Sequence, residues 1–298
     1  MGKGAAKRHM NWYIVMVGMI FLVILYEFLE HQLVQCRITQ LSFPSLPESS
    51  PRLRLCMISD LHNNKKLGSR RLLGKIRAFQ PDVILLCGDM VSKHTANTTA
   101  AQELIRQLAA LAPVIYSYGN HESAYRSRYP GAWKTFQEQL PKNCFLLDNE
   151  ALRLKPWLWI GGLTLPDCFY KKGRLLEQED LLPQLPDTGE ADGVVRILLA
   201  HNPDYARQYE AAYHADLILS GHIHGGLVRL PFFGGLISPR LRKPEYEGGF
   251  YRLPTSILFV SRGIGSHTLW VRFRNRAELN ELILTKQQEH TITLKNGD

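Results

Sequence analysis

The stretch Leu217-Ile-Leu-Ser-Gly-His-Ile-His-Gly-Gly226 carries the strongest structural signal in this chain of 298 residues. It begins with three apolar residues and ends with two histidines among three glycines. A short apolar run bounded by turn residues is typical of a strand that is buried on both faces. We therefore expect a strand over 217–219 that ends in a polar, glycine-flanked turn.

The same arrangement, in which polar residues follow a short apolar run, occurs at four earlier places in the chain. Apolar runs over 53–59, 83–87, 114–118 and 194–200 lead into Ser59-Asp60-Leu61-His62, Gly88-Asp89, Gly119-Asn120-His121-Glu122 and His201-Asn202-Pro203. Helical patterns separate them, over 72–79, 100–110, 131–140 and 203–212. In open α/β sheets, ligands bind beyond the carboxyl ends of the strands. We therefore expect all five polar clusters at one edge.

This alternation predicts an α/β fold of two stacked sheets with flanking helices. We further expect a first strand over 34–43, a short helix over 175–182, and short strands without a long helix after Gly221. The predicted division is a tail and membrane helix over 1–30, a first strand and linker over 31–51, a catalytic domain over 52–285 and a tail over 286–298. A chain of this length is ample for a buried core.

Composition narrows the class of protein. Hydrophobic residues make up 45% and charged residues 21% of the chain, which excludes disorder, collagen and coiled coil as the main architecture. The formal net charge of +9 favours anionic partners such as phosphates and acidic lipids. The five cysteines are odd in number and form no CxxC pair, which argues against a disulfide framework and a zinc ribbon.

The amino terminus has the pattern of a single membrane-spanning helix. Residues 10–26 contain no charge and are bordered by aromatic residues, as is typical of interfacial anchors. Basic residues precede the run and acidic residues follow it, so the positive-inside rule places the catalytic domain outside the cytoplasm. These flanking residues are Lys3, Lys7 and Arg8 on one side and Glu27 and Glu30 on the other.

Three other interpretations of this segment stay open. A cleaved signal peptide needs a small-x-small site, which residues 30–35 do not offer. Leu33-Val34-Gln35-Cys36 resembles a lipoprotein box, but Gln occupies a position where a small residue is usual. A buried core helix is the third alternative.

The polar clusters have the donor types of a metal site. Carboxylate and amide oxygens together with imidazole nitrogens suit divalent ions of the Mn, Fe or Zn class. The candidates are too many for one ion, whereas two ions that share a carboxylate would use them all and form a device for phosphate-ester hydrolysis. On an extended segment, His222 and His224 would point to opposite faces. They serve different ions only if the backbone turns at the flanking glycines.

In these blocks the chain resembles the calcineurin-like metallophosphoesterase superfamily, whose pattern runs D-x-H, G-D, G-N-H-[DE], H and G-H-x-H. The resemblance implies a four-layer α/β/β/α sandwich. It also implies that Asp60, His62 and His224 bind one metal, that Asn120, His201 and His222 bind the other, and that Asp89 bridges them. His121 would contact the substrate phosphate and protonate the leaving group. Glu122 is interpreted as a support for these residues rather than as a ligand.

Over residues 50–285 the chain is similar to a membrane-anchored bacterial subgroup of the YkuE and YaeI type. The similarity rests on residues 58–62, 199–204, 220–226 and 261–265, and the chain departs from the expected pattern at Ser266-His267-Thr268. Some members of the family act on UDP-diacylglucosamine, a cytoplasmic substrate that conflicts with the predicted topology. Outside the blocks, His94 and His267 are the histidines with the strongest claim to a site role.

The segment 225–276 holds nine Lys or Arg residues against two Glu residues, with apolar groups between them. Such a mixture suits a phosphorylated lipid or a membrane surface. Arg229 and Arg262 are the candidate substrate-binding residues, and the alternative is a β-hairpin with solvated arginines. No nucleic-acid partner is expected, because the chain contains no recognised nucleic-acid module.

These observations predict a membrane-anchored dimetal phosphohydrolase that cleaves a phosphomono- or phosphodiester with metal-activated water. Its substrate class is a phospholipid or a UDP-diacylglucosamine-like sugar lipid. A non-catalytic membrane scaffold and a soluble nucleotide phosphodiesterase are the alternatives.

Overall fold

The computed structural model describes residues 3–44, 46–47, 52–64, 70–170, 176–177, 193–226, 229–230, 234–235, 244–265, 272–286 and 295–296. Most of the helix expected over 175–182 lies outside these residues. So do His267 and three of the basic residues in the segment 225–276, namely Arg240, Arg242 and Lys243.

The first sheet has six strands in the order β1-β14-β2-β3-β4-β5. Their bounds are β1 Val34–Ser42, β14 Ala277–Thr285, β2 Leu53–Ile58, β3 Val83–Cys87, β4 Val114–Ser117 and β5 Cys144–Leu147. β2 to β5 run parallel, and β14 is parallel to β1 but antiparallel to β2. The strands β2, β3 and β4 are apolar at almost every position because both faces of the sheet are covered.

The second sheet has seven strands in the order β15-β12-β13-β9-β8-β7-β6. Their bounds are β15 Lys295–Asn296, β12 Gly249–Arg252, β13 Ile257–Val260, β9 Leu217–Ser220, β8 Val195–Ala200, β7 Leu158–Leu163 and β6 Glu150–Lys155. β13, β9, β8 and β7 are parallel. A separate two-stranded ribbon consists of β10 (Arg229–Leu230) and β11 (Gly234–Gly235).

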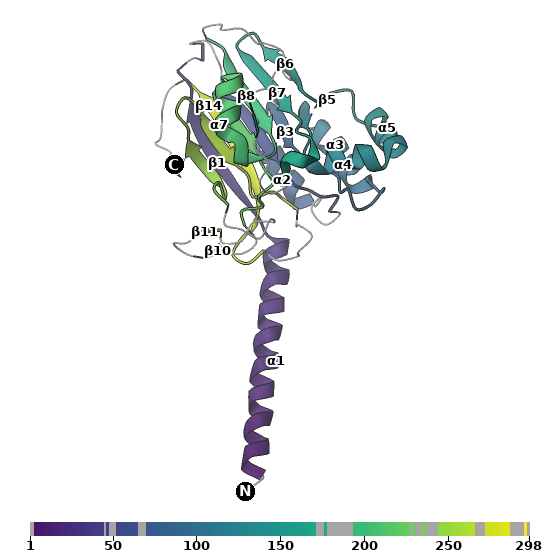
Figure 1. Cartoon of the computed structure of the whole chain (residues 1–298), viewed down its shortest axis with the longest axis vertical. Coiled ribbons are helices and arrows are strands. Elements are labelled where there is room, and N and C mark those ends of the chain that lie inside the picture. Colours follow the sequence, from purple (N-terminus) through teal and green to yellow (C-terminus); the bar gives the residue numbers. More distant parts are fainter. Residues whose placement is uncertain are drawn as a thin grey trace.

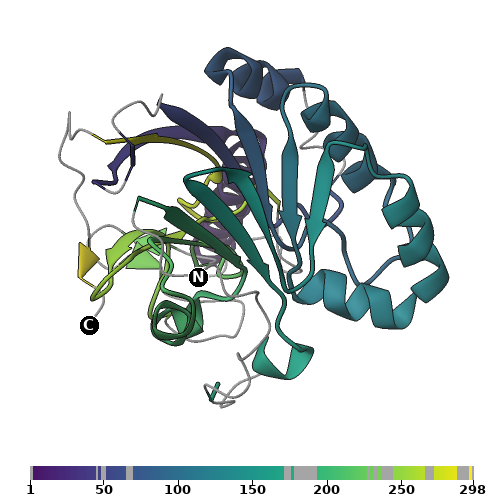
Figure 2. The ribbon, with the colours of Figure 1, turned by 90° about the horizontal axis from the view of Figure 1, so that it is seen from above.

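The two sheets stack face to face with helices outside them, which confirms the predicted sandwich (Figure 2). α2 (Arg70–Phe79), α3 (Thr99–Ala109), α4 (Asn120–Arg128) and α5 (Pro130–Glu138) lie on the side of the first sheet. α7 (Ala206–Tyr213), with the short helices η2 (Asp167–Tyr170) and η3 (Pro203–Tyr205), lies on the side of the second. Three buried apolar clusters fill the spaces between these layers, and residues such as Met57 and Leu199 form the central one.

Two elements differ from the expectations. The chain over 120–128 forms the helix α4, although its polar sequence lacks a helical apolar stripe. The expected short strands at the end of the chain include a nine-residue strand, β14, which inserts between β1 and β2. β1 therefore belongs to the same sheet as the strands that follow the linker.

Helix α1 (Lys3–Gln32) projects away from the sandwich (Figure 1). Its segment Trp12–Glu30 is long and apolar enough to cross a membrane, and the large apolar side chains of this segment are exposed rather than buried in the domain. The alternative of a buried core helix is therefore wrong. The last turns of α1 nevertheless contact the domain, because Glu30 forms an ion pair with Arg276.

The parallel register brings the carboxyl ends of the central strands of both sheets to one edge. Asp60 follows β2 and its N–H donates to the carbonyl of Gly88, which follows β3. In the second sheet, Gly221 after β9 donates to the carbonyl of His201 after β8. The N–H of His222 then donates to a carboxylate oxygen of Asp60 at 3.0 Å and joins the two sheets.

Candidate metal centre

The edge holds two groups of side chains that could each bind a cation. Asp60, His62 and His224 form one group, and Asp89, His201 and His222 form the other. Within each group, one potential ligand atom from each residue lies within 4.8 Å of those of the other two. The sequence prediction divided these six residues in the same way, with Asp89 as the bridge. The structure therefore brings together six of the seven predicted ligands, from loops up to 164 positions apart.

In the first group, two imidazole rings stack against each other with their outer nitrogens in close contact. The Nε2 atoms of His62 and His224 lie 3.1 Å apart. The Nε2 of His224 is also 3.4 Å from Oδ1 of Asp60. Either one of the two rings carries its hydrogen on Nε2 and donates it to the other, or a cation lies between the two nitrogens. A divalent ion would be such a cation.

In the second group, a backbone contact sets the orientation of one histidine. The Nδ1 of His201 lies 2.8 Å from the carbonyl oxygen of Cys87, so Nδ1 carries a hydrogen and donates it. Nε2 of the same ring is then directed at Oδ2 of Asp89, 3.1 Å away. A histidine that donates from one nitrogen and presents the other to a cation is the usual arrangement at protein metal sites.

The Asp89 carboxylate lies between the two groups. Its Oδ2 atom is 3.1 Å from Nε2 of His201 in one group and 3.9 Å from Nε2 of His62 in the other. Its Oδ1 accepts a hydrogen bond of 2.8 Å from the N–H of His121. Asp89 thus has one oxygen held by the backbone and the other directed toward both groups, as a bridging ligand requires.

The titratable groups at this edge shift one another's pKa values. Burial raises the pKa of Asp60 to about 6, against the opposing effect of His201. Burial also acts to raise the pKa of Asp89, but His201 and His121 hold it well below its usual range. For His201, burial lowers the pKa, whereas Asp89 and the bond to Cys87 raise it well above the ordinary value. The site therefore stabilises positive charge next to Asp89.

The seventh predicted ligand, Asn120, occupies the first position of α4. Its side chain is buried, and its Oδ1 atom accepts no hydrogen bond within the part of the chain that the structure describes. A buried carbonyl oxygen without a donor costs about 1–3 kcal/mol. The backbone N–H of the next residue, His121, donates to Asp89, so Asn120 lies on the loop that borders the two groups. The donor set as a whole fits a pair of divalent ions.

The backbone at the site is locally strained. Six non-glycine residues have a positive φ between 50° and 68°, a region that L-residues rarely adopt: Asp60, His62, Asn63, Asp89, His222 and His224. Such conformations cost roughly 1–3 kcal/mol each and persist where the surrounding structure enforces them.

The segment from Gly221 to Gly226 is a turn and not an extended strand. The N–H of Ile223 donates to the carbonyl of Gly221, and the N–H of Gly226 donates to the carbonyl of Ile223. His222 and His224 therefore reach different groups because the backbone reverses, as the flanking glycines predicted. A Cβ on Gly221 would lie 2.5 Å from Oδ2 of Asp60, so no larger residue fits there without displacement.

Glu122 holds the loops that carry Asp89 and His121 in place. Its two oxygens accept hydrogen bonds from the N–H groups of Asp89 (2.7 Å), Gly119 (2.8 Å) and Val91 (3.1 Å). A fourth bond of 2.7 Å comes from the hydroxyl of Tyr116. With its acceptor positions occupied in this way, Glu122 acts as a support, as the sequence predicted.

His121 lies beside both groups. It forms a third close set with His62 and Asp89. Its Nδ1 accepts a hydrogen bond of 3.3 Å from the N–H of Lys93, so its ring hydrogen is on Nε2 in the neutral form. Burial lowers its pKa to about 4, which keeps the ring neutral near pH 7. The exposed His94 packs edge-on against it, with ring centroids 5.7 Å apart.

Two residues near the site carried no recognisable signal in the sequence. Tyr170 ends η2 and packs edge-on against His222, with ring centroids 5.0 Å apart. Arg272 is buried, and its guanidinium donates to the carbonyls of Arg262 and Gly265. Arg272 thereby holds the loop that contacts Asp60. Neither residue lies in a motif, and only the tertiary structure brings them here.

The candidate substrate-binding residues Arg229 and Arg262 both lie against acidic partners. Arg229 donates to the carbonyl of Gly225 at 2.6 Å and lies 3.6 Å from Glu247. Arg262 is mostly buried, and its Nε atom lies 4.0 Å from Glu278. Their role toward a substrate stays a prediction.

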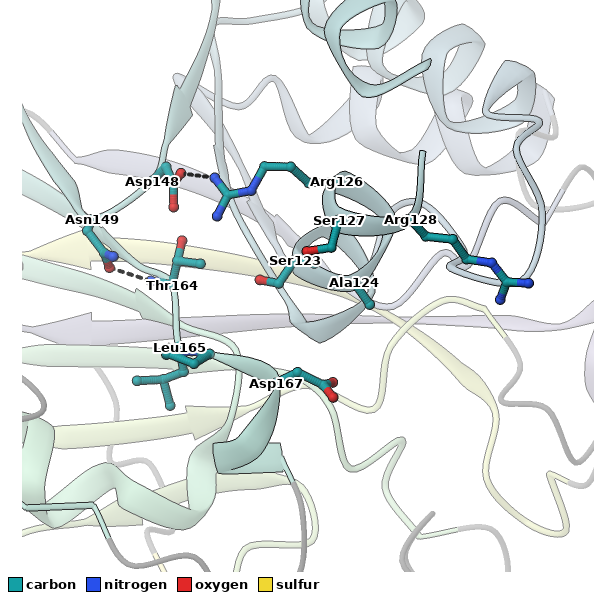
Figure 3. A pocket seen from close by; sticks show the side chains of 11 residues that line it. Ser123, Ala124, Arg126, Ser127, Arg128, Asp148, Asn149, Thr164, Leu165 and Asp167 are labelled. Carbon is teal, nitrogen blue, oxygen red and sulfur yellow. Dashed lines mark hydrogen bonds and ion pairs between the residues drawn. The ribbon is translucent and has the colours of Figure 1, made fainter. Parts of the chain in front are cut away.

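A pocket of about 600 Å³ lies between α4 and the loop from β7 to η2 (Figure 3). Its lining is polar, with Arg126 paired to Asp148 on one side and Asp167 on the other. α4 begins with Asn120 and His121, and η2 ends with Tyr170. The pocket is therefore flanked by elements that also carry residues of the candidate site.

The model of the calcineurin-like phosphoesterase family matches residues 53–226, which include all seven candidate ligands. The chain belongs to this family of metal-dependent phosphoesterases. The family uses a dimetal site, consistent with the two groups described above.

Curated relatives extend this similarity beyond the family domain. The chain is 25% identical over 269 residues to the uncharacterized metallophosphoesterase YkuE of Bacillus subtilis, covering 87% of this chain and 88% of that protein. A transmembrane protein with a metallophosphoesterase domain from Bos taurus is 26% identical over 80% of this chain, which spans 54% of that protein's length. The UDP-2,3-diacylglucosamine pyrophosphatase LpxG of Chlamydia muridarum is 26% identical over 74% of this chain and 80% of its own length.

Proposed function

We propose that this phosphoesterase is a membrane-anchored dimetal phosphohydrolase that cleaves a phosphomono- or phosphodiester, or a pyrophosphate, on a lipid or sugar lipid. The observation that carries the proposal is the position of Asp89. One of its carboxylate oxygens faces His62 of one group and His201 of the other, as a ligand shared by two ions must.

In this proposal the two groups hold two divalent ions. Asp60, His62 and His224 bind one ion, Asn120, His201 and His222 bind the other, and Asp89 binds both. Such a pair supplies a water of lowered pKa and positive charge for the phosphate oxygens. The proposed ions are of the Mn, Fe or Zn class, because the donors are oxygens and imidazole nitrogens without a cysteine.

The remaining residues bind and orient the substrate. His121 directs its Nε2–H toward the phosphate and assists departure of the leaving group, since Nδ1 is already occupied by the N–H of Lys93. Glu122 holds this histidine and Asp89 in position through its hydrogen bonds to the loops that carry them. Arg229 and Arg262 are proposed to contact the anionic substrate at the rim.

The lipid part of the proposal is supported by α1 and by the similarity to LpxG, whose name gives UDP-2,3-diacylglucosamine as its substrate. The charges that flank α1 favour an extracytoplasmic domain, whereas a UDP-linked lipid is cytoplasmic. We therefore propose a lipid-linked phosphate compound as the substrate class. A UDP-sugar lipid would be the substrate if the domain lies on the cytoplasmic side.

Substitution of the bridging carboxylate tests the proposal. Asp89→Asn should abolish metal-dependent hydrolysis of an aryl phosphate by the full-length protein. Asp82→Asn is the matched control, because Asp82 is exposed at the opposite edge and its oxygen accepts the N–H of Arg54, which an amide also permits. Unchanged activity of Asp89→Asn would refute the proposal, and a wild-type protein that binds metal but hydrolyses no ester would indicate the non-catalytic scaffold.

A second measurement separates the anchored enzyme from a soluble nucleotide phosphodiesterase with a cleaved leader. The full chain should fractionate with membranes and retain Met1 or Gly2 at its amino terminus. Release into the soluble fraction with a new amino terminus beyond residue 30 would favour the soluble enzyme.

A further inference from the structure

The direction in which α1 leaves the domain defines which edge of the sheets lies at the membrane. α1 ends at Gln32 and β1 begins at Val34, so only Leu33 separates helix from strand. The uncharged run of residues 10–26 spans about 26 Å as a helix, close to the hydrocarbon thickness of a bilayer, which leaves Glu27 and Glu30 at the interface. If α1 spans the membrane, the start of β1 therefore lies at the headgroup level.

The register of the first sheet places the candidate metal centre at that same level. Val34 at the start of β1 pairs with Ala277 at the start of β14. β14 runs antiparallel to β2, with Asn280 opposite Met57, so the chain after β2 returns to the level of Ala277 as it reaches Asp60. Neighbouring strands are about 4.8 Å apart, which puts Asp60 roughly 10 Å from the start of β1.

Three contacts prevent the domain from turning away from this orientation. A carboxylate oxygen of Glu27 accepts the backbone N–H of Arg272 at 3.0 Å. Glu30 forms an ion pair of 3.1 Å with Arg276. The rings of Tyr26 and Phe273 pack with centroids 5.3 Å apart. The exposed Arg274 lies on the same segment and adds positive charge at the level of the headgroups. Figure 1 shows α1 meeting the domain close to β10 and β11, which follow the His224 loop.

From these contacts we infer that the metal centre faces the surface of the bilayer that α1 enters and takes its phosphoester from a lipid headgroup in the adjacent leaflet. This inference rests on the proposed function. The interfacial region of a leaflet is roughly 6 Å thick, so a headgroup phosphate near the end of α1 is within reach of an edge held about 10 Å away. A soluble phosphoester gains nothing from this placement.

A rigid spacer that lifts the domain tests the inference. About 20 residues of helix-forming sequence, followed by a second copy of residues 26–32, are inserted after Gln32 of the full chain. The insertion of about 27 helical residues raises the domain by about 40 Å, and the copy keeps the contacts of Glu27 and Glu30 with the domain. In the control variant the same insertion precedes Trp12, where it leaves the distance between domain and bilayer unchanged.

Both variants and the wild type are reconstituted in phosphatidylcholine vesicles. Each protein is assayed on two nitrophenyl phosphodiesters, a soluble one whose second alcohol is methanol and a vesicle-bound one whose second alcohol is diacylglycerol. We expect the lifted variant to lose at least about tenfold in rate on the diacylglycerol ester, with the methyl ester hydrolysed as by the wild type. An unchanged ratio of the two rates would overturn the inference and leave the hydrolase proposal intact. A wild type that hydrolyses neither ester, nor an aryl monophosphate, would overturn both.

A distance measurement keeps the test independent of activity. A fluorophore is attached at Arg274→Cys, near α1, or at Lys155→Cys, at the opposite end of the strands, in a background with the partly exposed Cys36, Cys144 and Cys168 changed to Ser. Energy transfer to acceptor-labelled lipids should be strong from position 274 and weak from position 155. Equal transfer from both positions would contradict the inferred orientation.

Discussion

His201 donates its Nδ1 hydrogen to the carbonyl of Cys87 and presents Nε2 to Oδ2 of Asp89 at 3.1 Å. The imidazole and the carboxylate are both buried, so their charges are determined by each other more than by solvent. A metal ion that binds between them must displace the proton that the pair holds in its absence. Metal affinity and proton release are therefore linked.

The first prediction concerns this linkage. In the metal-free protein Asp60, with a pKa of about 6, and His201, with a raised pKa, hold protons that a metal displaces. Apparent metal affinity should therefore rise with pH, by about tenfold per unit for each proton displaced, most steeply below pH 6. Calorimetric titration in buffers of different ionisation enthalpy measures the protons released.

The variant His121→Asn is the control for proton release. The pKa of about 4 leaves His121 neutral at pH 6 and above, so its removal should not change the number of protons released. Metal affinity that is independent of pH would contradict the prediction.

The second prediction concerns Glu122. Glu122→Gln replaces one acceptor oxygen by an amide, which faces the N–H groups of Asp89 and Gly119 at one position or the N–H of Val91 at the other, so at least one buried donor loses its partner. We expect a loss of about 1–3 kcal/mol in the free energy of unfolding, together with weaker metal binding. Urea denaturation and a metal titration measure the two effects. Glu103→Gln, on the exposed face of α3, should change the stability by less than about 0.5 kcal/mol.

The third prediction concerns the close approach of Gly263 to Asp60. Gly263 has φ +68°, and a Cβ there would lie 2.6 Å from Cβ of Asp60. Gly263→Ala should cost about 1–3 kcal/mol of stability and displace Asp60, which lowers the metal content of the purified protein. Gly74→Ala is the control, because a Cβ at this position in α2 would meet nothing within 4 Å, and it should stabilise by about 0.5–1 kcal/mol. Full metal content in Gly263→Ala would contradict the expectation.

The fourth prediction concerns the protonation state in which His121 acts. If the protonated ring of His121, with a pKa of about 4, were the active form, the activity of the enzyme would fall about tenfold per pH unit above pH 4. We expect instead that the neutral ring acts as a donor through Nε2. His121→Asn should then lower kcat by about 100-fold, by a factor that stays constant between about pH 6 and 8. The exposed His94→Asn should change kcat by less than about threefold. A factor that shrinks steadily with rising pH would show that His121 acts as an imidazolium.

Local sequence was sufficient for most of the sandwich, because short apolar runs bounded by turn residues favour strands that are buried between covering layers. The run 83–87 and the strand β3 have the same bounds. Local sequence was insufficient for α4, whose helical state depends on the hydrogen bonds of Glu122 to Gly119 and to the neighbouring loops. It was also insufficient for β14, since nothing local indicates that the strand separates β1 from β2.

The order of residues alone determined which donor side chains stand directly after which strands, since a chain that leaves a buried strand must place its next residues at the sheet edge. Only the tertiary structure decided how those donors combine. The turn at Gly221 sends His222 and His224 to separate groups, and the packing of two sheets places Asp89 between them. The position of Asp60 beside the end of α1 likewise depends on the register of β1, β14 and β2. Several of these relationships join residues that are far apart in the sequence, such as Asp60 and His224 at 164 positions, and hydrogen-bond register and close packing set them, not local conformational preference.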